Sequence, residues 1–125
     1  MAISDFSVAR LDETASLLAG RGADAQRAEL DVSVWVAVGE YAATIAEHFG
    51  VVHQLYNNAG IAFSRSVLET EYADYGRLFA VNLWGVIHGT KGSLPRLVAS
   101  GDGHRWAAVW EAPREVDRVL KGRLH

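Results

Sequence analysis

Alternating strand-like and helix-like segments constrain the fold of this chain more than any other feature of its sequence. Short strands are predicted at residues 2–6, 28–32 and 51–56. Each is followed by apolar residues spaced three and four apart, which predict helices over 8–18, 34–49 and 72–94. This order is typical of an α/β domain with a parallel sheet. Parallel sheets bind ligands at the carboxyl ends of their strands, so Asp5, Asp31–Val32 and Asn57–Gly60 are the candidate positions.

Residues at the predicted helix ends indicate where each helix begins and stops. Ser7 and Ser33 are expected to cap the first two helices, and Gly20 and Gly50 to end them in the left-handed conformation. Pro95 is expected either to kink the third helix or to begin a new turn. The segment 20–25 fits a loose dinucleotide-binding pattern, but it follows a helix and precedes a strand, so we interpret it as a turn.

Composition excludes several classes of function. The chain has 12 basic and 15 acidic residues, a net charge of −3, and no clustered basic face for nucleic acid. It lacks cysteine, and its five histidines show no metal-binding spacing, so no metal site is predicted. His88 is expected on a helix surface. No apolar run approaches the roughly 20 residues that cross a bilayer. We therefore expect a soluble cytoplasmic protein that binds neither nucleic acid nor membrane.

The tetrad Asn57-Asn58-Ala59-Gly60 is the most informative motif. Its small residues let backbone approach a ligand closely, and its two amides can bind a ligand or a neighbouring strand. An ordinary strand-ending turn would use the same residue types. The tetrad alone leaves both interpretations open.

Two longer segments resemble motifs of the short-chain dehydrogenase/reductase family. They are Leu55-Tyr56-Asn57-Asn58-Ala59-Gly60-Ile61 and Phe79-Ala80-Val81-Asn82-Leu83-Trp84-Gly85, preceded in family order by Leu30-Asp31-Val32. The resemblance covers residues 1–104, which are predicted to form one dinucleotide-binding domain. It implies a partial Rossmann-like α/β domain with a doubly wound parallel sheet. The implied activity is NAD(P)-dependent hydride transfer between nicotinamide and an alcohol or carbonyl compound, with the substrate unspecified.

The resemblance also assigns roles to individual residues. Asn58, Ala59 and Gly60 would line the cofactor beside its adenosine ribose. Asp31 and Val32 would contact the adenine, with Asp31 accepting from the exocyclic amine. Asn82 would support the water of the family's proton relay. Without the resemblance, Asp31 would be a solvated strand end and Asn82 a polar residue within a helix.

Asp5 bears on the choice between the two nicotinamide cofactors. An acid at such a strand end can bind both ribose hydroxyls and repel a 2′-phosphate, which favours NAD over NADP. Arg10 is the alternative, because an arginine could accept that phosphate. Arg10 lies on the helix beyond the strand end, so Asp5 and NAD are preferred.

Several family features are absent from these 125 residues. There is no glycine-rich turn for the pyrophosphate and no Tyr-x-x-x-Lys pair, and no serine follows Ser100. Residues 105–125 depart from the family pattern as a divergent tail. We therefore expect a truncated copy that is inactive alone. With the family's first strand absent, the strands ending at Asp5 and before Asn57 should pair directly or separate and expose apolar edges.

Two other functions remain open. In the first, the chain is a non-catalytic remnant that forms homo- or hetero-oligomers, for example with a full-length relative, through the helix Tyr72–Leu94, which the resemblance places in the family's dimer interface. In the second, it is an unrelated small α/β binding module. That reading requires several motifs to occur in family order by coincidence.

Overall fold

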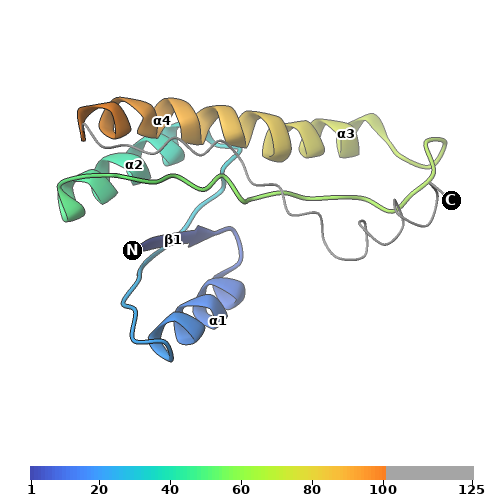
Figure 1. The fold of residues 1–125 in the computed structure, drawn as a ribbon. Helices are drawn as coiled ribbons and strands as arrows, with labels where there is room; N and C mark the ends of the chain where they lie inside the picture. Colours follow the sequence, from blue (N-terminus) through green and yellow to red (C-terminus); the bar gives the residue numbers. More distant parts are fainter. Residues whose placement is uncertain (101–125) are drawn as a thin grey trace, which may run out of the picture.

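The computed structural model describes residues 1–100, and the predicted tail at 105–125 lies outside them. The elements are, in order, β1 (Ala2–Asp5), α1 (Val8–Ala19), β2 (Gln26–Glu29), α2 (Trp35–Phe49), α3 (Tyr72–Phe79), the π-helix η1 (Ala80–Trp84) and α4 (Gly85–Ala99). Figure 1 shows β1 and α1 on one side of the molecule and α2 beside α4 on the other. The predicted α/β class is confirmed.

The amino-terminal part of the chain is a βαβ unit in which α1 connects two parallel strands. Ala2 is opposite Gln26 and Asp5 is opposite Glu29, so the two strands have equal length. Leu11 of α1 is buried, as is Leu30 directly after β2. The second strand begins at Gln26 and ends at Glu29, whereas 28–32 was predicted. It ends at Glu29 because β1 offers backbone partners only as far as Asp5.

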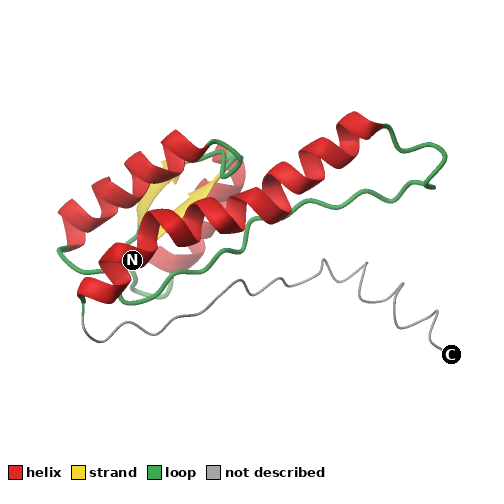
Figure 2. Ribbon diagram, turned by 90° about the horizontal axis from the view of Figure 1, so that it is seen from above, coloured by secondary structure: helices red, strands yellow, loops and turns green. Residues whose placement is uncertain are grey.

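The elements α3, η1 and α4 form one long helix, and α2 lies along its carboxyl-terminal part (Figure 2). Val38 and Ala42 of α2 are buried together with Leu97 of α4. The two helices meet at Gly92, where an added Cβ would make ordinary van der Waals contact with Val38 and Ala42 at 3.7 Å. This seam is the main apolar contact between helices in residues 1–100.

The long helix extends beyond the predicted end at Leu94 and passes through Pro95 to Ala99. Proline removes one backbone donor from a helix interior. In the same turn the Arg96 guanidinium donates to the Gly92 carbonyl oxygen at 2.8 Å. None of the helices among residues 1–100 combines the length and the apolar character needed to cross a membrane.

The strand predicted at 51–56 is absent from the structure. These residues run alongside the long helix (Figure 1) and the sheet of the described chain contains only β1 and β2. An apolar sequence makes a strand only where a neighbouring backbone satisfies its N–H and C=O groups. The segment before Asn57 was expected either to pair directly with the strand ending at Asp5 or to separate from it. In the described residues the two segments are separate.

The cap predictions are partly wrong. Ser7 occupies the N-cap of α1 without a side-chain cap bond, and α2 begins after Val34 rather than Ser33. Gly20 is right-handed with φ −61°, whereas Gly22, two residues later, has φ +75°. Gly50 ends α2 as predicted and has a positive φ of +75°, but its ψ of −39° lies outside the left-handed helical region. At Gly20 the backbone simply continues the helical turn, and the chain reverses at Gly22.

Much of the apolar surface is uncovered. Five hydrophobic side chains in residues 1–100 are buried, while Phe6, Trp35, Leu68 and others of similar size are exposed. Tyr41 of α2 is half-buried, and burial raises the pKa of its phenol, with a smaller opposite effect from the Ser4 hydroxyl of β1.

Candidate functional site

The carboxyl end of the two-stranded sheet brings two predicted site residues together. The Leu30 N–H donates to the Asp5 carbonyl oxygen at 3.0 Å, so Asp5 lies beside the backbone that leads into Asp31. The Asp5 Oδ1 accepts from the Ser7 N–H at 2.8 Å. This bond fixes the carboxylate at the end of β1. Its Oδ2 has no hydrogen-bond partner among residues 1–100.

Asp31 organises the turn between β2 and α2. Its Oδ1 accepts from the Ser33 N–H at 2.9 Å and from the Ser33 hydroxyl at 2.6 Å. The Val34 N–H donates to the Asp31 carbonyl oxygen at 3.1 Å, which closes the turn. Ser33 therefore bonds to Asp31 instead of capping α2. Only the Asp31 Oδ2 remains without a bond from the described part of the chain.

Val32 is held against α4 through both its backbone and its side chain. The His88 Nδ1 lies 3.0 Å from the Val32 carbonyl oxygen. A Cβ at Gly85 would lie 2.7 Å from the Val32 Cγ2, so only glycine permits this approach. The prediction of a surface position for His88 is wrong, because its ring is half-buried and bonded to the turn.

Asn58, Ala59 and Gly60 lie exposed between two fixed residues. On one side the Asn57 Nδ2 donates to the Thr90 hydroxyl at 3.3 Å, and its Oδ1 occupies the space that a Cβ at Gly89 would fill. On the other side, Ile61 is held by the long helix. The three exposed residues keep their backbone accessible while both ends are anchored, an arrangement suited to ligand contact.

Asn82 is the residue that holds Ile61. Its Oδ1 accepts from the Ile61 N–H and its Nδ2 donates to the Ile61 carbonyl oxygen, both at 2.8 Å. Asn82 lies in η1, a π-helical turn of the kind often found at functional sites. The sequence singled out Asn82, but its spacing gave no indication of the π-turn or of the bond to Ile61.

The long helix therefore positions two cofactor-site candidates that are distant in sequence. Val32 contacts Gly85, and Asn57 contacts Gly89, one helical turn further along α4. One turn of helix rises about 5.4 Å. The Asp31–Val32 turn and the Asn57–Ile61 segment thus dock on neighbouring turns of one helix. The structure brings these two segments and Asn82 into one region around η1 and α4, whereas Asp5 lies beside Leu30 at the end of β1.

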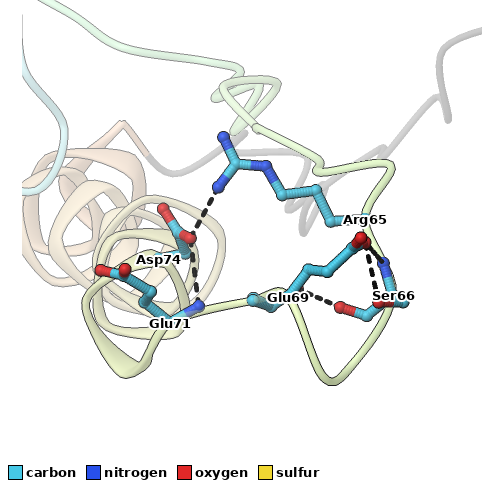
Figure 3. Close-up of polar contacts among 6 residues, drawn as sticks. Arg65, Ser66, Glu69, Glu71 and Asp74 are labelled. Carbon is cyan, nitrogen blue, oxygen red and sulfur yellow. Dashed lines mark hydrogen bonds and ion pairs between the residues drawn. The ribbon is translucent and has the colours of Figure 1, made fainter.

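A cluster of polar contacts precedes α3, and the sequence reasoning did not anticipate it (Figure 3). Arg65 forms an ion pair with Asp74 at 3.0 Å, and the Glu71 N–H donates to the same Asp74 carboxylate at 3.3 Å. Ser66 donates its hydroxyl and its N–H to Glu69. These bonds lower the pKa of the Glu69 carboxyl. The cluster orders the loop that joins Ile61 to the long helix.

Metal ligation has no support in the described region. Across residues 1–100, no group of three or more histidine, aspartate and glutamate side chains is arranged to hold a metal ion. The candidate site is instead composed of carboxylates, amides and exposed backbone.

Comparison with known proteins identifies the family. The family model for short chain dehydrogenases matches residues 1–104. This chain belongs to the short-chain dehydrogenase family. The putative oxidoreductase SadH of Mycobacterium tuberculosis is 44% identical over 104 residues, which is 83% of this chain and 38% of that relative. The meso-2,3-butanediol dehydrogenase of Serratia marcescens is 34% identical over 120 residues and is matched over 47% of its length.

Solved structures of this family share the fold. An alcohol dehydrogenase from Thermococcus sibiricus, complexed with 5-hydroxy-NADP, has a TM-score of 0.72 at 31% identity, covering 80% of this chain and 43% of that one. A short-chain dehydrogenase/reductase from Burkholderia phymatum, in complex with NAD, has a TM-score of 0.73 at 31% identity, covering 79% and 35%. The prediction of a partial Rossmann-like fold is confirmed. The chain spans about two fifths of the length of SadH.

Proposed function

We propose that this chain provides the adenosine end of an NAD site in a short-chain oxidoreductase. The supporting observation is that one helix anchors both the Asp31–Val32 turn and the Asn57–Ile61 segment, leaving Asn58, Ala59 and Gly60 exposed between their anchors. Two family relatives of known structure are complexes with NAD and with 5-hydroxy-NADP. Bound nicotinamide would supply or accept hydride, with an alcohol or carbonyl compound as the other reactant.

The chemistry of the donor and acceptor groups fits an adenosine moiety. The Asp31 Oδ2 has no protein donor within residues 1–100 and could accept from an exocyclic amine. The Asp5 Oδ2 also has no protein donor within residues 1–100 and could accept hydrogen bonds from ribose hydroxyls. A carboxylate at the Asp5 position would repel a 2′-phosphate. We therefore propose NAD rather than NADP as the preferred cofactor.

Hydride transfer also needs an acid or base near the reacting carbonyl group. Within the 125 residues no tyrosine stands four positions before either lysine, Lys91 or Lys121. Asn82, the one residue assigned to the family's catalytic group, bonds to Ile61. We propose that the 125 residues by themselves bind the cofactor without catalysing hydride transfer.

Titration calorimetry of the full chain with NADH, NADPH and adenosine diphosphate ribose tests this proposal. NADH and adenosine diphosphate ribose should bind with similar affinity, since the proposed site contacts the adenosine end, and NADPH should bind more weakly. Asp31→Ala should weaken NADH binding about ten- to hundredfold, since hydrogen bonds to a charged group contribute about 1.5–3 kcal/mol.

Asp24→Ala is the matched control for Asp31→Ala. Asp24 is an exposed carboxylate just before β2, at the opposite end of the strand that leads to Asp31. Its replacement should leave NADH affinity unchanged. Absence of saturable NADH binding by a chain that melts cooperatively would refute the proposed cofactor site, and equal losses from both variants would refute the assignment of Asp31. Oxidation of NADH by the chain with a carbonyl substrate would refute the proposed lack of catalysis.

A second candidate function is association with a longer relative through the helix Tyr72–Leu94. The observation that favours it is a series of half-exposed apolar side chains on the long helix: Phe79 (53% exposed), Leu83 (50%) and Trp84 (53%). We propose that these side chains pack against another subunit. The test is light scattering on the chain alone and mixed with purified Serratia meso-2,3-butanediol dehydrogenase. Leu83→Glu should abolish any complex, whereas Leu17→Glu, on the exposed face of α1, should not.

A further inference from the structure

His88 joins three parts of the molecule at a place that the family motifs do not include. Its ring centroid lies 6.1 Å from that of Trp35, at the start of α2, and 6.0 Å from that of Trp84, in η1. Its Nδ1 lies 3.0 Å from the Val32 carbonyl oxygen. The imidazole thus contacts the turn after β2, the helix that follows the turn, and the π-helix that carries Asn82.

The hydrogen bond determines which ring nitrogen carries the proton. A carbonyl oxygen only accepts, so the His88 Nδ1 must donate. In the neutral ring the proton is therefore on Nδ1, and Nε2 is left as an acceptor. The two indoles limit the orientations of the ring, which keeps Nδ1 directed at the turn.

The other bonds of the turn are all local. Asp31 accepts from Ser33, and the Asp31 carbonyl oxygen accepts from the Val34 N–H. These bonds shape the turn but do not attach it to the rest of the molecule. The bond from His88, together with the approach of Val32 to Gly85, provides that attachment.

We infer that His88 is a positioning residue, which fixes the Asp31–Val32 turn on α4 and so sets where the Asp31 carboxylate lies. It is not a catalytic residue, since it acts on the ligand only through the turn. The inference rests on the proposed function where it concerns nucleotide binding. The attachment of the turn itself is independent of any ligand.

Two amide substitutions separate this role from simple packing. In His88→Asn the side-chain nitrogen is bonded to Cγ, as Nδ1 is, and can still donate to Val32. In His88→Gln the nitrogen is one bond further out, at the place of Nε2. His88→Leu retains apolar bulk beside Trp35 and Trp84 but has no donor. The three variants therefore differ chiefly in whether a donor stands at the Nδ1 position.

The first measurement is ligand-free NMR of the full chain. Long-range nitrogen–proton correlation should show His88 protonated on Nδ1 with Nε2 unprotonated. The amide resonances of Ser33 and Val34 should shift in His88→Leu and His88→Gln and return toward the wild-type values in His88→Asn. An Nε2–H tautomer, or equal shifts in all three variants, would overturn the positioning role.

The second measurement is NADH affinity by calorimetry, with thermal melts of the same samples. Affinity should fall about five- to tenfold in His88→Leu and His88→Gln, in keeping with the loss of one hydrogen bond, and recover in His88→Asn. Unchanged affinity in folded His88→Leu would overturn the inference. If wild-type protein binds no NADH, the proposed function fails, and the NMR measurement alone decides the role of His88. If His88→Leu does not fold, the comparison of His88→Asn with His88→Gln decides it.

Discussion

Two short segments lead into the candidate site, and they are held there by different means. β2 (Gln26–Glu29) is polar in sequence, yet it is a strand because β1 offers a parallel backbone along its whole length. Residues 51–61 are more apolar, yet they form no strand and are held by side chains of the long helix. Backbone pairing, rather than strand propensity, decides which segment becomes a strand.

The difference has an energetic consequence. A ladder distributes its stability over many backbone bonds, so no single side chain is essential to it. The 57–61 segment depends on Asn82, Gly89 and Thr90, so single substitutions there should release it. The following predictions test this contrast.

The largest effect is expected from Asn82→Ala. It removes both bonds to Ile61 and leaves a part-buried N–H and C=O without protein partners. We expect a loss of about 1–3 kcal/mol in the free energy of unfolding. Hydrogen exchange should accelerate at Ile61 while the amides of β2 remain protected. Unchanged protection at Ile61 would contradict the role given to Asn82.

A comparison of two glycines in α4 gives the next largest effect. In Gly89→Ala the new Cβ would overlap the Asn57 Oδ1 and must displace that side chain, whereas in Gly92→Ala the nearest atoms are at 3.7 Å. Gly89→Ala should therefore be less stable than Gly92→Ala by about 1–3 kcal/mol, the usual cost of overpacking. Chemical denaturation measures the difference. Because both substitutions gain the same helix propensity, equal stabilities would mean that Asn57 is not held against α4.

A smaller effect is expected within the βαβ unit. Arg27 of β2 and Asp12 of α1 form an ion pair at 2.9 Å, but both side chains are more than half exposed. Asp12→Ala should change the free energy of unfolding by less than about 0.5 kcal/mol. A loss above 1 kcal/mol, measured at physiological salt, would show that this unit also depends on single side chains.

The smallest effect concerns pH and the loop before α3. Hydrogen bonds from Ser66 lower the pKa of the Glu69 carboxyl below its value in the unfolded chain. Their contribution to stability is therefore present above the unfolded pKa and is lost as pH falls through the folded pKa. In Ser66→Ala, NMR titration should show the Glu69 pKa rising toward its ordinary value. An unchanged pKa would mean that the Ser66 hydroxyl does not hold this carboxylate.

The sequence by itself determined the α/β class, the approximate helices and the family. The helices depend on local apolar periodicity and on Gly50, whose positive φ is a local property of glycine. The family motifs also predicted Asp31, Asn58 and Asn82 as site residues, and their roles stay predictions. All of this information lies in neighbouring residues.

Tertiary structure alone decided which segments pair and what each site residue touches. The 51–56 segment has strand-like composition but no backbone partner among residues 1–100. The bond from His88 to Val32 spans 56 positions, and the bonds from Asn82 to Ile61 span 21. Such contacts depend on how α4 packs against distant segments, and Gly85 and Gly89 permit that packing. Local pattern cannot specify them, because their geometry exists only once the helices have assembled.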